Sequence, residues 1–288
     1  MNNKKEEFND DSPIIPLYYD RAFKLIFNKS KEVLTKLLSD VLDYEVKDDA
    51  EIIIGKEALG KHIKGKYFIH DIVIKVNDTN YVCLELNANK YAYNINRNLY
   101  YIFDLLLSLL SIGMKIEDLD EYKVILLNLN MFSNICNKLI EEIGLFSKES
   151  NIKVSDIIKI INFDIAKCRK IRYNNNKEKD NLVIWGSIFS AKTVNELSYL
   201  LGDDILTMEE KNRFLDNVRM ANQNEEIISL WRSETNERLK QESIERGYRE
   251  EGKEEIIKNM LSEKLDYEII SKVTGKTIEE IKEIESNM

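Results

Sequence analysis

The sequence predicts an α/β fold in which helices flank a mixed central sheet and a helical tail follows. The first observation is a hairpin pattern within residues 65–101. Two runs rich in β-branched and aromatic residues, 66–76 and 81–88, flank the polar link 77–80. The second is a continuous apolar run of strand length at residues 122–132, typical of a strand covered on both faces. The third is the helical spacing of apolar residues before and after these strands.

Composition limits the class of protein. The 288 residues are 43% apolar, enough for one main domain plus an appendage, and 2 prolines with 10 glycines argue against long linkers. A net charge of -9 excludes a generally basic DNA-coating protein but not a local basic groove. Three widely spaced cysteines fit no zinc or disulfide pattern. With no apolar signal segment and no membrane-length run, we expect a cytoplasmic protein with no membrane contact.

The chain divides into three expected regions. Residues 1–15 are polar and expected to be disordered, residues 16–205 to form the main domain, and residues 206–288 the helical tail. In the main domain we expect a helix from Asp20 to Leu42 and another from about Asn89 to Leu110, with Leu99, Phe103, Leu106 and Leu110 on its core side. Further expected elements are a short strand at 51–55, a strand with a basic end at 159–172 and a helix at 182–201.

The tail changes composition from Met208. Charges of both signs surround a thin, irregular apolar stripe, which predicts a long amphipathic helix. Two short helical patterns broken at residues 274–276 then predict a helix-turn-helix-like end. This end is net acidic, so we expect docking or homo-oligomerisation through these helices rather than major-groove binding.

Two acids stand in the hairpin strands, where acidic residues are disfavoured. They are Asp71 and Glu85, and they converge only if odd-numbered residues pair with odd-numbered ones across the hairpin. A two-residue loop at Asp78–Thr79 would set Val76 against Tyr81 and place the acids on opposite faces. A three-residue loop or a bulge would bring them together.

Converging carboxylates beside a backbone carbonyl would form an oxygen-rich site suited to Mg²⁺ or Mn²⁺. Such a metal acidifies a water for attack on a phosphodiester. Asn87 lies on the same strand face as Glu85, in position to orient that water, although a lysine would also bring positive charge. A lysine-rich stretch at 56–66, which includes Lys64 and Lys66, is either a phosphate-facing patch or a solvated loop.

Several motifs carry a family resemblance. In chain order they are DRAFKLIF at 20–27, HDIV at 70–73, ELN at 85–87, Arg97 with Tyr100 and Tyr101, GYREEG at 247–252 and the turn at 274–276. With them the chain resembles the PD-(D/E)XK nuclease superfamily, whose signature is an Asp on one strand and Glu-x-Lys or Glu-x-Gln on the next. More closely, it resembles the recombination-promoting nuclease (Rpn) and putative transposase family.

The resemblance implies a PD-(D/E)XK, restriction-endonuclease-like core and a metal-dependent DNA endonuclease. Asp71, Glu85 and the Leu86 carbonyl would bind Mg²⁺ or Mn²⁺, and Asn87 would orient the water. Asp20 would support a second metal or the helix start. Phosphate-binding residues would be Arg97, Tyr101, Lys24, Lys64 and Lys66.

Other interpretations stay open beside these roles. Asn87 is one methylene shorter than the family's Gln, so a catalytically degenerate fold that binds DNA or protein through its tail is the alternative. Asp71 and Glu85 could be solvent-facing edge acids, and Asp20 a plain helix cap. Lys24 could be a surface lysine or the partner of a carboxylate, and Arg97 and Tyr101 could merely pack on the sheet. With only two histidines, His-based nucleases and Ser-His-Asp hydrolases are disfavoured.

Overall fold

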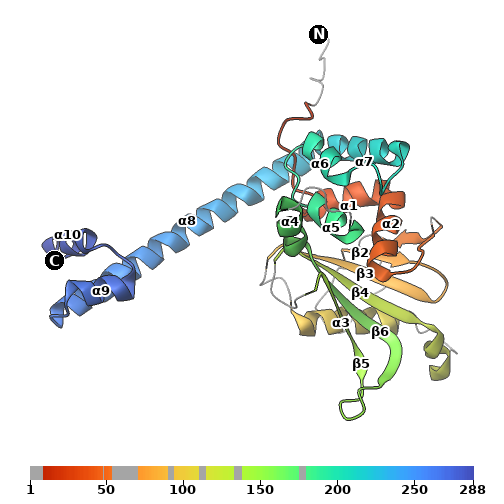
Figure 1. Ribbon diagram of the computed structural model, residues 1–288, viewed down its shortest axis with the longest axis horizontal. Helices are drawn as coiled ribbons and strands as arrows, with labels where there is room; N and C mark the ends of the chain where they lie inside the picture. The colour runs from red at the N-terminus through yellow and green to blue at the C-terminus, as the bar shows by residue number, and fades with distance from the viewer. Residues whose placement is uncertain are drawn as a thin grey trace, which may run out of the picture. The chain divides into compact units, whose positions relative to one another are not determined.

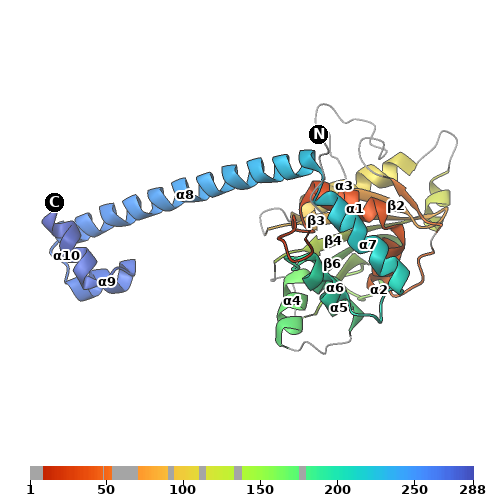
Figure 2. The ribbon, with the colours of Figure 1, turned by 90° about the horizontal axis from the view of Figure 1, so that it is seen from above.

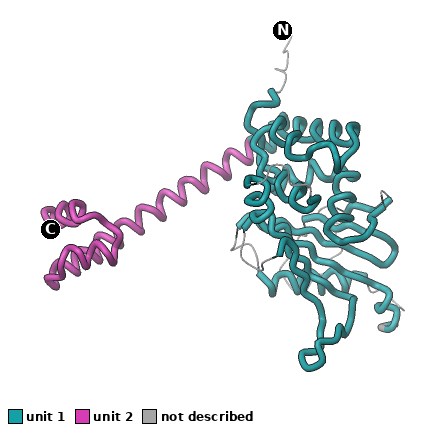
Figure 3. The backbone as a smooth tube through the Cα atoms, in the orientation of Figure 1, with its two compact units in different colours: residues 1–228 teal, residues 229–288 magenta. Residues whose placement is uncertain are grey.

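The computed structural model describes residues 9–47, 49–53, 71–89, 94–109, 115–132, 138–174 and 180–288. It divides the chain into two compact units, residues 1–228 and 229–288 (Figure 3). The expected boundary at residue 205 falls between two helices of the first unit, and the reason lies in how the second of these helices packs.

A six-stranded mixed sheet forms the centre of the first unit (Figure 1). Its order is β1-β2-β3-β4-β6-β5, with β3, β4 and β6 parallel and the remaining pairs antiparallel. The strands are β1 (Glu51–Ile53), β2 (Ile72–Lys75), β3 (Asn80–Asn87), β4 (Lys123–Asn130), β5 (Ile140–Phe146) and β6 (Lys153–Asp164). Together with the flanking helices this confirms the predicted α/β class.

Both faces of the sheet are covered. The helix α3 (Ile95–Leu109) packs on one face, in a cluster that includes Val73, Cys83 and Leu126. The other face carries a layer of helices, visible in Figures 1 and 2. These are α1 (Asp20–Lys29), α2 (Lys31–Leu42), α4 (Ile165–Asn174), α5 (Asn181–Ile188), α6 (Val194–Leu201) and α7 (Met208–Ala221). The central strands are therefore buried on both sides, which explains why residues 123–130 read as one apolar run.

The helix α3 presents a different face to the core from the one we expected. Asn98, Tyr101, Ile102 and Leu105 are its buried residues. Leu99 and Leu106 only flank the cluster, Phe103 is 47% exposed, and Leu110 lies outside the described residues. The expectation followed hydrophobicity alone, whereas the helix turns a polar residue, Asn98, and the hydroxyl-bearing Tyr101 toward the sheet.

Other elements also differ in extent from the expectations. The helix expected over Asp20–Leu42 is broken at the buried Ser30, whose hydroxyl accepts a hydrogen bond from Asn217 Nδ2 (2.8 Å). The stretch 159–172 is the end of β6 followed by α4, and 182–201 is two helices, α5 and α6. The edge strand β5 was not predicted, because its seven residues lack regular apolar alternation.

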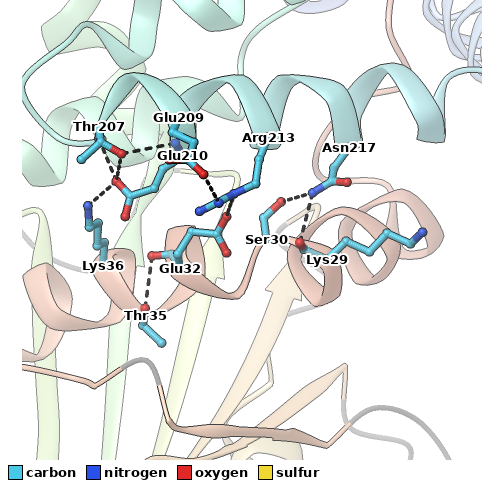
Figure 4. A network of polar contacts seen from close by, with 10 residues as sticks. All are labelled: Lys29, Ser30, Glu32, Thr35, Lys36, Thr207, Glu209, Glu210, Arg213 and Asn217. Carbon is cyan, nitrogen blue, oxygen red and sulfur yellow. Dashed lines mark hydrogen bonds and ion pairs between the residues drawn. The ribbon is translucent and has the colours of Figure 1, made fainter.

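The helix α7 is held against α1 and α2 by charged and polar contacts (Figure 4). Lys36 pairs with Glu210 (2.6 Å) and Glu32 with Arg213 (3.1 Å), and Asn217 Nδ2 donates to the Lys29 carbonyl (3.1 Å). Its apolar face buries Phe214, Leu215 and Val218. Because these contacts join α7 to the start of the chain, the compact unit extends past residue 205.

The N-terminal segment is packed from Asn9 onward, contrary to the expected disorder of residues 1–15. Asp10 pairs with Arg219 of α7, Ile14 and Ile15 are buried, and the Ile15 N–H donates to Asn222 Oδ1 (2.6 Å). Residues 1–8 lie outside the described part. No helix in the described part of the chain has the length and apolar character needed to cross a membrane.

The second unit is helical, as expected for the tail. It contains most of α8 (Glu225–Ser262), then α9 (Tyr267–Thr274) and α10 (Ile278–Ser286). Gly275 ends α9 with φ 72°, a left-handed conformation that favours glycine. A small core of Ile257, Ile270 and Ile281 joins the three helices.

Candidate active site

The β2–β3 hairpin has the register that brings its two acids together. Val73 pairs with Cys83 and Lys75 with Tyr81, so odd-numbered residues oppose odd-numbered ones. The Val76 N–H donates to the Asn80 carbonyl (2.8 Å), which leaves a three-residue loop at 77–79. The Asn77 side chain holds this loop by accepting from the backbone N–H groups of Thr79 (3.0 Å) and Asn80 (2.7 Å).

Asp71 and Glu85 lie side by side at the end of these strands. The Asp71 N–H donates to Glu85 Oε1 (3.2 Å), and the Leu86 N–H donates to Asp71 Oδ2 (2.9 Å). Each carboxylate is thus held by a backbone amide of the neighbouring strand. Glu85 is 4% exposed, so it is not a solvent-facing edge acid. Two acids in such close contact, one buried and one partly buried, favour a site over a chance surface position.

A lysine from α1 reaches this pair. Lys24 Nζ lies 3.3 Å from Asp71 Oδ1 and 2.7 Å from Asp20 Oδ1, one helical turn earlier. Lys24 is therefore the partner of carboxylates rather than a free surface lysine. Asp20 is the first residue of α1 and makes no side-chain cap at that end. The DRAFKLIF motif thus places an acid and a cation beside the two strand acids.

Asn87 lies at the centre of a buried polar network. Its Nδ2 donates to Asn128 Oδ1 and to Asn130 Oδ1, both at 3.0 Å. Its Oδ1 accepts from Arg97 Nη2 (2.8 Å). Asn128 Nδ2 donates to Asn162 Oδ1 (3.1 Å), so side chains of β3, β4 and β6 are joined in one row. The remaining hydrogen-bonding capacity of Asn87 is the second lone pair of Oδ1.

Arg97 and Tyr101 lie on one face of α3, as their spacing predicts. The Arg97 guanidinium carbon lies 5.6 Å from the centre of the Tyr101 ring. Arg97 Nε is buried and has no hydrogen-bond partner among the described residues. Tyr101, at 6% exposed, belongs to the apolar cluster under α3, so its ring packs against the sheet and supports Arg97. Lys64 and Lys66 lie outside the described residues.

The asparagines of β4 and β6 hydrogen-bond to Asn87 and to one another, a role that we did not predict from the sequence. Asn128 and Asn130 stand in the apolar run 122–132, where a buried strand normally carries no amide, and this interruption was the available signal. The β3–β4–β6 register then aligns Glu85 with Asn128 and Asn162, and Asn87 with Asn130 and Asp164. The polar row therefore marks the carboxyl ends of the three parallel strands.

The environment of the two acids favours their neutral forms. Burial, and then the nearby Asp71 charge, raise the pKa of Glu85 to about 8. Burial also raises the pKa of Asp71, although the Leu86 N–H and Lys24 act against this shift. For Lys24, partial burial lowers the pKa, but the contacts with Asp20 and Asp71 outweigh it and the pKa is raised. Lys24 therefore stays charged near neutral pH.

The donor atoms fit a hard divalent cation. Asp71 and Glu85 offer carboxylate oxygens, and these two close acids, of which Glu85 is buried and Asp71 partly buried, gain from a compensating positive charge. Within the described ranges no three Asp, Glu, His or Cys side chains form a metal-binding group.

Comparison with known proteins identifies the family. The model of the PD-(D/E)XK nuclease family transposases matches residues 17–247, which includes the hairpin, the polar row and every helix from α1 to α7. No curated protein and no solved structure matches the chain.

Proposed function

Because this chain belongs to the PD-(D/E)XK nuclease family transposases, we propose that it is a metal-dependent endonuclease that hydrolyses phosphodiesters of DNA. The observation that carries the proposal is the pairing of Asp71 with Glu85 at one strand end, beside the Lys24 ammonium. Two oxygen ligands and a cation within contact distance suit phosphoryl chemistry, in which positioning and charge stabilisation do most of the work.

Asp71, Glu85 and the Leu86 carbonyl would hold Mg²⁺ or Mn²⁺. When bound, such an ion acidifies a water and neutralises charge on the phosphate. The backbone amides of Asp71 and Leu86 each hold one of the two carboxylates by a hydrogen bond. Asp20 draws the Lys24 ammonium toward the site and could give a second ion an oxygen ligand.

Lys24 and Arg97 would supply positive charge at the phosphate. Lys24 of α1 lies beside Asp71. On β3, Asn87 occupies the position of the superfamily's signature lysine, so Lys24 would supply the positive charge that Asn87 lacks. Arg97 is held by Asn87 and supported by Tyr101. The second lone pair of Asn87 Oδ1 would accept a hydrogen bond from the attacking water.

Plasmid nicking tests the proposal. The wild-type protein is expected to nick supercoiled DNA with Mg²⁺ or Mn²⁺ and to lose this activity in EDTA. Asp71→Asn and Glu85→Gln are expected to lower the rate at least 100-fold, since each removes a charged ligand. Asp78→Asn is the matched control, because this acid lies in the same hairpin with its side chain 99% exposed. Equal cutting by Asp71→Asn and Asp78→Asn would refute the assignment.

The alternative is a catalytically degenerate nuclease fold that binds DNA or protein, acting through its helical tail. Two observations favour it: Asn87 stands where the family has Gln, and Leu239, Ile244 and Tyr248 are exposed along α8. Calorimetric titration with Mn²⁺ separates the two. Binding lost in Glu85→Gln supports the enzyme. Absence of binding together with self-association lost on removal of 229–288 supports the interaction module.

The biological setting is proposed from the family and the cysteines. We infer a role in recombination or mobile-element movement, with DNA as the substrate. Cys83 and Cys168 are free and buried, in keeping with the reducing cytoplasm.

A further inference from the structure

A basic pocket lies between α4 and α6, away from the carboxylate pair. Its volume is about 760 Å³, and its lining includes Arg169, Lys170 and Tyr173 of α4, Lys192 from the α5–α6 connection, and Tyr199 of α6. We call this set of residues the basic pocket. With Arg172, four cations line it against one carboxylate, Glu196, although the whole chain carries a net charge of -9. Such a local reversal of charge indicates an anionic ligand.

The charge of the basic pocket is available to a ligand. Glu196 already accepts a hydrogen bond from the Lys192 backbone N–H (2.7 Å), and Arg172 donates to the Leu200 carbonyl (3.5 Å). In the described part of the chain, the side chains of Arg169, Lys170 and Lys192 form no ion pair.

Two tyrosines accompany the cations. Tyr173 is 91% exposed and Tyr199 is 62% exposed, although both rings are large enough to bury in a core. Exposed tyrosines between lysines and arginines can donate hydroxyl hydrogen bonds to phosphate oxygens and pack on sugars. This chemistry fits a polymeric phosphate backbone better than a small inorganic anion.

The sheet register relates the basic pocket to the carboxylate pair. Asn87 of β3, Asn130 of β4 and Asp164 of β6 are aligned in neighbouring strands, and α4 begins at Ile165 (Figure 1). Strands lie about 4.8 Å apart, so the start of α4 is roughly 10 Å from Asn87. Arg169 and Lys170 follow four and five residues later, roughly 6–8 Å along the axis of α4, so the separation is at most roughly 20 Å.

That separation suits one substrate bound across both places. Phosphates of one DNA strand follow each other at about 3.4 Å along the duplex axis, so a separation of at most roughly 20 Å corresponds to at most about six nucleotides. The Glu85 and Asn87 side chains face α3, whereas α4 covers the opposite face of the sheet. Both places lie at the carboxyl ends of the parallel strands, so a duplex that crosses this edge of the sheet could place one phosphate at Asp71 and Glu85 and another at α4.

We propose that the basic pocket binds backbone phosphates of duplex DNA within about half a helical turn of the cleaved bond. The inference rests on the proposed function and adds a sequence-independent anchor for its substrate. Arg169 and Lys170 contact phosphate, Lys192 approaches from the opposite wall, and the tyrosines bound the groove. The anchor fixes the position of the DNA without reading its bases.

Binding of a short DNA duplex in EDTA tests the anchor without cutting. The test variant is Arg169→Gln with Lys170→Gln, two exposed positions on α4. The matched control is Lys123→Gln with Lys148→Gln. Both lysines are exposed; Lys123 begins β4 and Lys148 follows β5, at the edge of the sheet away from the carboxyl ends of the parallel strands. We expect at least a tenfold loss of affinity for the test variant and less than threefold for the control. A charge-preserving variant, Arg169→Lys with Lys170→Arg, is expected to bind like the wild type.

Salt dependence gives a second readout. The slope of log K against log salt is negative, and each lost phosphate contact reduces its magnitude by about 0.9. The test variant loses two contacts, so we expect the magnitude of its slope to be smaller by nearly two. Equal affinity and slope for test and control variants would overturn the anchor, as would binding of single-stranded RNA but not duplex DNA. If the wild-type protein binds DNA through the basic pocket but does not nick plasmid, the proposed nuclease activity is refuted, whereas phosphate binding by the basic pocket is supported.

Discussion

At the scale of single residues, protonation of Glu85 makes the stability of the protein depend on pH. Its pKa is raised from the ordinary 4.5 to about 8, mainly by burial. Between about pH 4.5 and 8 the folded protein therefore keeps a proton that the unfolded chain has released. The free energy of unfolding of the metal-free protein should fall as pH rises through this window.

Urea unfolding in EDTA at pH 5.5, 7 and 8.5 measures this slope. Glu85→Gln is expected to flatten it, because the amide carries no titrating proton. Glu45→Gln, at an exposed position, serves as the control and should keep the wild-type slope. A slope in Glu85→Gln equal to that of the wild type would show that the acid is not held neutral by its surroundings. Because a bound metal must displace the proton, Mn²⁺ affinity should rise over the same interval.

The sequence predicts the two site carboxylates but not all of the residues that surround them. Asp71 and Glu85 could be picked out because acids are out of place in strands, and their convergence could be stated as a condition on the loop. Whether the loop has two or three residues depends on the hydrogen bonds that the Asn77 side chain accepts from Thr79 and Asn80, and the sequence alone does not show these bonds. The hydrogen-bonded row of Asn87, Asn128 and Asn162 can be predicted only when the order of the strands is known, because the three asparagines come from separate segments.

At the scale of elements, strongly patterned segments were predictable and boundaries were not. The run 122–132 became β4 because a central strand is apolar on both faces. The break at Ser30 arises from a distant partner, Asn217 of α7, which no local pattern reveals. β5 is an edge strand with exposed residues on both sides, so it lacks the alternation that marks a half-buried strand.

The crossing of α4 and α5 leads to a prediction at this scale. A Cβ added at Gly186 would overlap Cys168 and come within 3.5 Å of the Phe163 ring. Gly186→Ala should therefore force the helices apart and lower the free energy of unfolding by about 1–3 kcal/mol. Denaturant titration measures the loss. Gly247→Ala in α8, where a Cβ meets nothing within 4 Å, is the control and should be neutral or stabilising. Unchanged stability of Gly186→Ala would contradict this close packing.

At the scale of the whole molecule, the end of the first unit is set by packing rather than by composition. The charge content rises from Met208, which placed the expected boundary near residue 205. Yet Phe214, Leu215 and Val218 of α7 are buried, and Arg213 and Asn217 contact α2 and the α1–α2 break. An amphipathic helix that covers a core is rich in charge on its outer face, so its composition resembles that of a solvated tail.

Two truncations distinguish the boundaries. A chain ending at Ile228 keeps α7 and should unfold cooperatively at nearly the temperature of the full protein, because the first unit has its own core. A chain ending at residue 205 exposes the surfaces that Phe214, Leu215 and Val218 cover. Each such side chain contributes about 1.5–3 kcal/mol, so their joint loss approaches the whole stability of a typical domain. Thermal unfolding followed by circular dichroism, with size-exclusion chromatography for aggregation, measures both. Matching melting temperatures for the two truncations would mean that α7 belongs to the tail after all.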